Sequence, residues 1–436
     1  MNYLLLFILL LIVFIVYFFN EFDVLSPSII SISLYIISTM VIIINQSFWN
    51  EKVSFLAILF ISLGLFSFVI GEIISIFIFR RKSKNKFYNQ MKDFNKIRIP
   101  MYTIIFLTII GIFIEIYYFK YIYKLALAGG YGINGRSILF NARAAMLDTS
   151  INIAPSWILK FGRSALEGFS LICIYIFIYN KVFANTKKIE WRYLLPNILY
   201  IIQMILSTGR TELIYFIMYI LILLFIIWKI RYNWSKKIDF RIIKYALIGI
   251  IIFLISFRLL GYLTGKSQYL NLWNNFSIYL GSPIIAFSKY LNKNITNTIF
   301  GEETLSNFYR IMNHFGFDFK IIAVPLEPVI WDNVKTNIYT SLRRYIQDYT
   351  ILGMILIQFI LGLLYGSWFN WIKRKNLIGF PLILFSKLFY PVLESVIEER
   401  FFNLVLTPGS VYDVIMLYIM YKVLIHKYNQ SEFYPL

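Results

Sequence analysis

Long, unbroken apolar runs constrain the fold of this chain more than any other feature. A helix that crosses a bilayer needs roughly 20 mostly apolar residues, and about eleven such runs follow one another in the sequence. Hydrophobic residues make up 59% of the 436 residues and charged residues only 15%, with a mean hydropathy of +0.70. An outer-membrane barrel would instead show short segments of alternating polarity. The sequence therefore predicts an all-α polytopic membrane protein with about 11 transmembrane helices, within a range of about 10–12.

The positions of the basic residues set the expected orientation of these helices. The expected spans cover about 3–19, 28–46, 53–79, 100–126, 157–179, 193–207, 212–228, 245–262, 350–370, 377–395 and 409–425. Lysine and arginine gather in the loops 80–98, 229–244 and 373–375, which the positive-inside rule assigns to the cytoplasm. The N-terminus is then outside and the C-terminus inside, and the first run, which lacks a basic leader and a cleavage site, is expected to be retained. Because loop placement accounts for the net charge of +20, we expect no nucleic-acid partner.

Two longer hydrophilic segments fall on the expected outer side of a single integral membrane domain, 1–436. Segment 129–155 is rich in glycine and asparagine, which favours an external loop with short helical pieces. Segment 263–349 carries eight basic and six acidic residues, and it is expected to form a large external loop with short surface helices. With one cysteine, Cys173, and two histidines, the chain predicts neither a disulfide framework nor a metal centre, and we expect no cofactor.

A charged, helix-patterned segment runs without a break into the expected span 350–370. Its polar residues fall on one face at the helical period, and they are Thr340, Arg343, Arg344, Gln347 and Asp348. Two adjacent guanidiniums at the mouth of a membrane helix suit a phosphate or pyrophosphate, because each planar fork bonds two anionic oxygens. The alternative is that the arginines are interfacial anchors, with an i,i+4 ion pair between Arg344 and Asp348.

Arginines are unusually frequent on the expected outer side, where topology depletes basic residues. They are Arg136, Arg143, Arg210, Arg310, Arg343, Arg344 and Arg400. Arg210 lies beside Glu212 in a turn too short for anything but a tight connection, whereas Arg400 is expected to make a local ion pair with its glutamate neighbours. We expect Arg210 and Arg343 to gather at the outer boundary of the membrane and hold a departing diphosphate.

Several short motifs resemble the oligosaccharide repeat-unit polymerases, the Wzy-type O-antigen and capsular polysaccharide polymerases. They are the segment 336–340, Arg343-Arg344-Tyr345, Asp348-Tyr349, Gly353, Leu361-Gly362-Leu363, the turn Thr208-Gly209-Arg210-Thr211, and Gly281-Ser282-Pro283. The layout of about 130–425 matches the family, although the specific motifs occupy only about 30 residues. One departure is Thr350, where the family usually has glycine.

The resemblance implies a C-type glycosyltransferase-like fold in the bacterial inner (cytoplasmic) membrane, with a metal-independent active site facing the periplasm. Its donor and acceptor would be undecaprenyl-pyrophosphate-linked oligosaccharides in membrane lipid, and its partners a chain-length regulator and a flippase. The arginines would stabilise the anionic leaving group, and Asp348, Glu212 or His314 would accept the proton of the attacking hydroxyl. The candidates for substrate binding are Arg136, Arg143, Tyr339, Thr340, Arg310 and His314.

Three alternatives remain open at this point. An O-antigen ligase would share the external arginines but resembles the chain less over 337–353. A metal-dependent lipid-phosphosugar glycosyltransferase would need an external acidic pair, and the spacing Glu21-Phe22-Asp23 falls on the expected inner side. A flippase or exporter of lipid-linked oligosaccharide predicts evenly short loops and charged residues lining the spans, whereas this chain has one dominant external segment.

Overall fold

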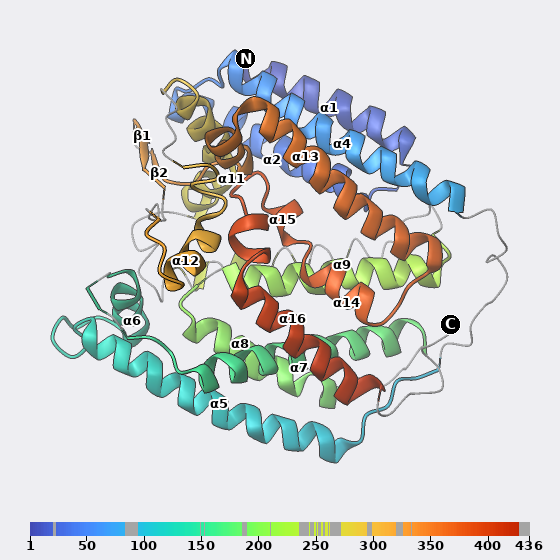
Figure 1. Cartoon of the computed structure of the whole chain (residues 1–436), viewed down its shortest axis with the longest axis vertical. Coiled ribbons are helices and arrows are strands. Elements are labelled where there is room, and N and C mark those ends of the chain that lie inside the picture. Colours follow the sequence, from blue (N-terminus) through green and yellow to red (C-terminus); the bar gives the residue numbers. More distant parts are fainter. Residues whose placement is uncertain are drawn as a thin grey trace. The chain divides into compact units, whose positions relative to one another are not determined.

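Long helices dominate this chain in the computed structural model, as its apolar runs predict (Figure 1). The structure describes residues 1–20, 23–82, 95–148, 150–151, 153–184, 190–209, 211–234, 244, 248–249, 251, 254–255, 258–259, 261, 272–293, 299–319, 326–332 and 334–426. Within these residues, eight helices are long and apolar enough to cross a membrane, and only two short strands occur. The protein is therefore an all-α, multi-pass membrane protein.

Eight of the expected spans coincide with these eight helices, and two others differ from the expectation. The expected span 193–207 is a shorter helix, α8 (Leu195–Leu206), which follows the 3-10 turn η1 (Trp191–Tyr193). The expected span 377–395 is divided into α14 (Phe380–Lys387) and α15 (Tyr390–Leu393). Pro391 stands in the first turn of α15, where its missing N–H prevents a continuous helix. More than half of the expected span 245–262 falls outside the described residues, so it stays a prediction.

The chain divides into two compact units, each assembled from separate stretches of sequence. The first unit comprises Met1–Asn89, Asn271–Leu377 and Leu388–Pro408. Its elements are α1 (Asn2–Phe19), α2 (Pro27–Ile44), α3 (Gln46–Trp49), α4 (Phe55–Lys82), α11 (Leu272–Tyr290), α12 (Ser306–His314), β1 (Val329–Trp331), β2 (Val334–Thr336), α13 (Ser341–Lys375), α15 and the π-helical turn η2 (Phe401–Val405). This unit holds both arginines of the predicted polar stripe.

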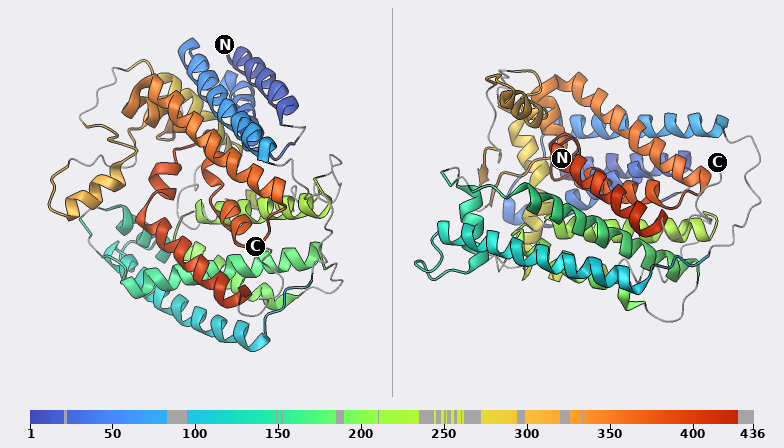
Figure 2. Two further views of the ribbon diagram at one scale, coloured as in Figure 1. Left: turned by 45° about the vertical axis from the view of Figure 1, so that its right-hand side comes forward. Right: turned by 60° about the horizontal axis from the view of Figure 1, so that its bottom comes forward.

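Helices α4 and α13 form the main framework of the first unit, and Figures 1 and 2 show them side by side. Glycines allow this close approach. A Cβ atom on Gly362 would lie 2.0 Å from the Phe68 carbonyl oxygen, and one on Gly71 would lie 2.2 Å from the Phe359 carbonyl oxygen. Small residues that let helix backbones touch are a common basis of helix association in membranes. The glycine in Leu361-Gly362-Leu363 is thus a packing residue, which fixes the course of α13.

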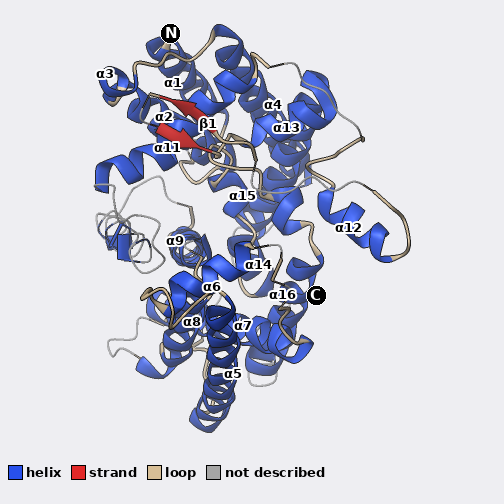
Figure 3. Cartoon of the chain, turned by 90° about the vertical axis from the view of Figure 1, so that its left-hand side faces the viewer, coloured by secondary structure: helices blue, strands red, loops and turns tan. Residues whose placement is uncertain are grey.

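A small hairpin and helix α11 cover the N-terminal end of α13 within the same unit. Strands β1 and β2 pair antiparallel, and Figure 3 draws them in red. The hairpin is tied to α11 by a 3.1 Å hydrogen bond from the Ser282 hydroxyl to the Thr336 hydroxyl, and Trp331 packs edge-on against Trp49. The described part of the expected external segment 263–349 therefore contains one strand pair as well as helices.

The second unit comprises Gln90–Leu270, Ile378–Lys387 and Gly409–Leu436. Its described elements are α5 (Met101–Ala128), α6 (Ile138–Leu147), α7 (Trp157–Val182), η1, α8, α9 (Thr211–Arg231), α14, most of α16 (Pro408–Tyr421) and the π-helical turn η3 (Lys422–His426). Helix α6 lies in the expected external loop 129–155 and packs on α5 through an apolar cluster that includes Ile122, Ala142 and Leu159. Its Ser137 N-cap hydroxyl accepts a hydrogen bond from the Phe140 amide.

Candidate functional site

The polar stripe predicted at the start of α13 is buried inside the first unit. Thr340 is the N-cap of the helix, and Arg343, Arg344, Gln347 and Asp348 are all buried. Buried arginines are rare unless they are paired, because removing a charge from water is costly. These side chains must therefore have partners from other parts of the fold.

Glu303, from the loop before α12, is the partner that the two arginines share. Its Oε2 atom accepts a short hydrogen bond from Arg343 Nη1 and lies 3.4 Å from Arg344 Nη1. The side chains of Arg343, Arg344 and Glu303 are only 8%, 2% and 4% exposed. One carboxylate oxygen thus lies between two guanidiniums, in the position that suits an oxygen of a bridging phosphate.

Two tyrosine rings hold the Arg343 guanidinium in place. Its central carbon lies 4.6 Å from the Tyr290 ring centroid and 4.9 Å from the Tyr339 ring centroid. Burial raises the pKa of the Tyr339 hydroxyl to about 12, so this neutral group donates a 2.8 Å hydrogen bond to the Glu327 carbonyl oxygen. Tyr339, predicted as a substrate-binding residue, therefore contacts an arginine here.

The ion pairs continue from Arg344 to a second segment of the chain. Arg344 Nη2 lies 3.5 Å from Glu398, and Arg400 pairs with both Glu398 and Glu394, at 2.9 and 2.8 Å. The result is an alternating row of three arginines and three glutamates. The expectation of a local ion pair for Arg400 is thus met. Arg344 takes Glu303 and Glu398 as its partners in place of the considered i,i+4 pair with Asp348.

Asp348 holds the loop that carries Glu303. Its carboxylate accepts hydrogen bonds from the Glu303 amide at 3.1 and 3.2 Å, and from the Thr304 amide and hydroxyl at 2.7 Å each. These four contacts come from three donors and engage both carboxylate oxygens. Asp348, predicted as a candidate base, has a positioning role in this arrangement.

The helix changes direction directly after this cluster. Thr350 has φ 62° and ψ −172°, a backbone conformation that glycine adopts freely and a β-branched residue avoids. This is the position where the resembled polymerases usually have glycine. The preceding residue is tied to the loop that carries Glu303, because the Tyr349 and Thr304 hydroxyls hydrogen-bond to each other at 2.7 Å.

Both arginines keep an unused hydrogen-bond donor. Within the described part of the chain, neither Arg343 Nε nor Arg344 Nε has a hydrogen-bond partner, although both atoms are buried. The positive end of the α13 dipole lies at the same place. Burial raises the pKa of the Glu303 carboxyl above its usual value, while the two guanidiniums act in the opposite direction. The two arginines therefore carry more donors than Glu303 and Glu398 satisfy.

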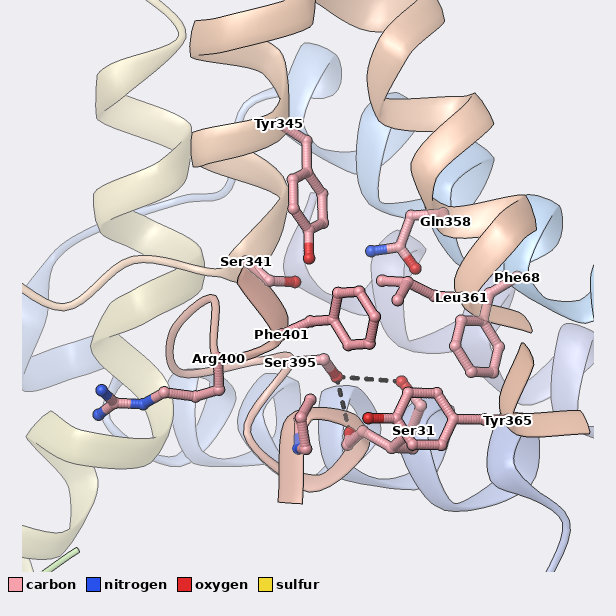
Figure 4. Close-up of a pocket in the computed structure, with 12 residues that line it drawn as sticks. Ser31, Phe68, Ser341, Tyr345, Gln358, Leu361, Tyr365, Ser395, Arg400 and Phe401 are labelled. Atoms are coloured by element: carbon pink, nitrogen blue, oxygen red, sulfur yellow. Dashed lines mark hydrogen bonds between the residues drawn. The ribbon is translucent and has the colours of Figure 1, made fainter. Parts of the chain in front are cut away.

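A small cavity of about 20 Å³ lies on another side of the α13 start, with room for about one water molecule. Figure 4 shows Ser341, Tyr345 and Gln358 around the ring of Phe401, while the guanidinium of Arg400 points away. Ser31 and Ser395 hydrogen-bond to each other at 3.1 Å beside it. This cavity is too small for a sugar or a diphosphate.

The second unit contains four of the other predicted candidates, which are Arg136, Arg143, Arg210 and Glu212. Arg210 lies outside the described residues, so its expected proximity to Arg343 stays a prediction. Arg143 Nη1 donates a 3.2 Å hydrogen bond to the Thr208 carbonyl oxygen, in the turn that leads to Arg210. Glu212 lies 3.8 Å from Arg163 Nη2, and its side chain is 42% exposed.

Arg163 connects Glu212 with a further buried polar group, Glu115 in the middle of α5. The Arg163 guanidinium lies over the Tyr118 ring, at 4.2 Å, and it acts electrostatically on Glu115. Among the described residues, neither Glu115 oxygen has a hydrogen-bond partner, although the residue is 7% exposed. Charged groups within membrane helices are expensive and often functional.

The remaining predicted substrate-binding residues lie at the surface of their own units. Arg136 is exposed, with its guanidinium 4.4 Å from the Phe140 ring centroid. Arg310 and His314 are exposed on α12. The structure therefore brings together Tyr339, Thr340, Arg343, Arg344 and Asp348, and it does not add Arg310 or His314 to that cluster.

Sequence reasoning missed Glu303 and Arg163. Glu303 had a weak signal, because Glu302-Glu303 is an acidic pair in an aromatic-rich part of the external segment. Arg163 had no such signal, because the residues before it in the sequence are typical of the start of an apolar helix. Among the described residues, no group of three or more His, Cys, Asp or Glu side chains is placed to hold a metal ion.

The fold and this site define a multi-pass, all-α membrane protein with a buried arginine–glutamate cluster. Comparison with known proteins finds similarity to one described as "Putative O-antigen polymerase" from Escherichia coli (strain K12), 27% identical over 219 residues. The match covers 49% of this chain, and the chain spans about half (52%) of the length of that relative. It supports the resemblance to the Wzy-type polymerases. No protein-family model matches the chain. No solved structure matches it either.

Proposed function

We propose that this protein is a glycosyltransferase that polymerises undecaprenyl-pyrophosphate-linked oligosaccharide repeat units into O-antigen or capsular polysaccharide. The reaction takes place at the outer face of the bacterial inner membrane and needs no metal. The observation that carries the proposal is the pair Arg343 and Arg344, buried side by side with unused Nε donors at the positive end of a helix. The similarity to an O-antigen polymerase supports a role in polysaccharide synthesis.

The chemistry of the reaction explains why adjacent arginines suit it. When the glycosyl–pyrophosphate bond breaks, the electron pair leaves with the diphosphate, and negative charge grows on its oxygens. Guanidiniums already fixed in place stabilise that charge without reorganising, and one such donor typically contributes about 100- to 1,000-fold in rate. Tyr290 and Tyr339 fix Arg343 in this way, and Glu398 fixes Arg344.

Reconstitution of the purified protein with a lipid-linked repeat unit tests the proposal. We expect dimers and longer products from the native protein, and at least about 100-fold less polymer from Arg343→Ala. Arg192→Ala is a matched control, because Arg192 also pairs with a glutamate, Glu190 at 3.1 Å, and lies over a tyrosine ring. It should polymerise normally.

Two other outcomes would indicate a different function for this protein. Transfer of the glycan to a different acceptor without self-polymerisation would indicate a ligase, and movement of the lipid-linked sugar across the bilayer without new bonds would indicate a flippase. Chelator should leave the rate unchanged, and loss of polymerisation on adding it would overturn metal independence. Polymer of normal length from Arg343→Ala would contradict the proposed role of the arginine pair.

A further inference from the structure

Glu303 differs from two nearby buried carboxylates, Asp348 and Glu399, in what it binds. Asp348 accepts hydrogen bonds from the backbone and the hydroxyl of the Glu303 loop, and Glu399 accepts them from the Phe402 and Asn403 amides. The carboxylates of Asp348 and Glu399 are therefore both held by backbone amides. The Glu303 side chain is instead held, among the described residues, by the two adjacent guanidiniums.

Those guanidiniums are the groups to which we assign the diphosphate. Carboxylate and phosphate oxygens make the same charge-assisted hydrogen bonds with arginine, so the two anions compete for one position. A diphosphate offers more oxygens and more charge than a carboxylate, and it can also reach the unused Nε donors of Arg343 and Arg344. It therefore has the advantage in an exchange.

The surrounding contacts determine which atoms move in that exchange. The Glu303 and Thr304 amides are bonded to Asp348, and the Thr304 hydroxyl is bonded to both Asp348 and Tyr349. These bonds fix the backbone of the loop, so rotation about the Glu303 side-chain torsions is the simplest way to release the carboxylate. It then stays within a side chain's length of the anion that replaced it.

We propose that Glu303 is the exchangeable group of this site: the substrate diphosphate displaces its carboxylate from Arg343 and Arg344, and the released carboxylate accepts the proton of the attacking sugar hydroxyl. This inference rests on the proposed function. The bond between the anomeric carbon and the diphosphate oxygen breaks, and its electron pair leaves on the diphosphate. The acceptor oxygen bonds the anomeric carbon, and its proton passes to Glu303, so no further reactant is needed.

The test measures two properties of the full-length protein in detergent: binding of inorganic pyrophosphate, and polymerisation of a lipid-linked repeat unit. We expect Glu303→Gln to bind pyrophosphate several-fold more tightly, because a competing anion is removed. We also expect it to polymerise at least about 100-fold more slowly, the usual contribution of a general base. A residue with only a structural role would weaken both properties together.

Three further variants complete the test. Glu327→Gln is the matched control, since the Glu327 side chain is 80% exposed and pairs with Lys293 at 3.3 Å; it should match the native protein in both assays. Arg343→Ala should lose both properties. Glu303→Asp keeps a carboxylate one methylene further from the guanidiniums, and it should bind pyrophosphate more tightly while retaining slow polymerisation. It also serves if Glu303→Gln does not fold.

The outcomes separate this inference from the proposed function. Native polymerisation by Glu303→Gln, or unchanged or weaker pyrophosphate binding by a folded Glu303→Gln or Glu303→Asp, would overturn the role of Glu303 and leave the proposed function standing. A native protein that neither binds pyrophosphate nor polymerises the repeat unit would overturn the proposed function itself.

Discussion

Glu303 in the first unit and Glu115 in the second are both buried carboxylates, yet their surroundings differ. Glu303 lies between two guanidiniums on a loop fixed by Asp348. Glu115 lies in the middle of a membrane helix, and within the described residues no group hydrogen-bonds to it. The comparison teaches that a charge in this protein is held tightly where several chain segments converge on it.

Arg163 shows the same contrast on the cationic side. It is 26% exposed and lies 3.8 Å from Glu212, whereas Arg344 is 2% exposed and bridges Glu303 and Glu398. An ion pair near solvent contributes little to stability, while breaking a buried one leaves an uncompensated charge. The first unit should therefore be far more sensitive to loss of a single charged group.

The largest effect on stability is expected for Arg344→Ala. The substitution leaves Glu303 and Glu398 without this guanidinium, so the free energy of unfolding should fall by about 3–5 kcal/mol. Chemical unfolding of the detergent-solubilised protein, followed by circular dichroism, measures this. Arg136→Ala is the control, and as an exposed residue it should change the value by less than about 0.5 kcal/mol. An equally small change in the free energy of unfolding for Arg344→Ala would contradict the expectation that the first unit is more sensitive than the second to loss of a charged group.

The fall of the polymerisation rate at low pH tests whether ionisation of Glu303 alone controls the reaction. Its pKa is raised by burial, so the carboxyl takes up its proton at a higher pH than an ordinary glutamate does. Polymerisation should be constant above this pKa and fall as the pH is lowered through it, because only the ionised form accepts a proton. Glu115→Gln should leave that midpoint unchanged. A midpoint at or below the ordinary glutamate value, or one that moves in Glu115→Gln, would contradict this assignment.

Thr350→Gly should stabilise the first unit. Glycine removes the cost of holding a β-branched residue at φ 62°, which is worth about 1–2 kcal/mol. The matched control is Thr108→Gly inside α5, where the same change should destabilise by about 0.5 kcal/mol because the helix interior disfavours glycine. If both variants lose stability to the same extent, the turn after the arginine cluster is not strained.

The smallest effect is expected for Glu115→Gln. The amide has nearly the same shape and removes a charge that no hydrogen bond compensates in the described part of the chain. The free energy of unfolding should therefore stay the same or rise by up to about 1 kcal/mol. Glu303→Gln, measured in parallel, should instead lower the free energy of unfolding, because it weakens the pairing of two buried guanidiniums. A loss above about 2 kcal/mol in Glu115→Gln would show that Arg163 needs this carboxylate.

The sequence by itself determined the class of protein and the polar face of α13. Apolar runs of membrane-spanning length and the helical spacing from Thr340 to Asp348 are local properties, and each follows from residues within a few turns of one another. Eight of the expected spans were located in this way. Local signals also explain the departures, since Pro391 interrupts one expected span and Thr350 bends another.

Only the tertiary structure decided which groups the arginines contact. Arg343 and Glu303 are 40 residues apart in the chain, and Arg344 and Glu398 are 54 apart. Helical spacing instead suggested Asp348, four residues from Arg344, which binds a loop backbone. An ion pair or hydrogen bond requires contact within a few ångströms, and contacts between distant segments arise from the packing of the whole unit. The identity of the carboxylate that occupies the arginine pair therefore depends on the fold.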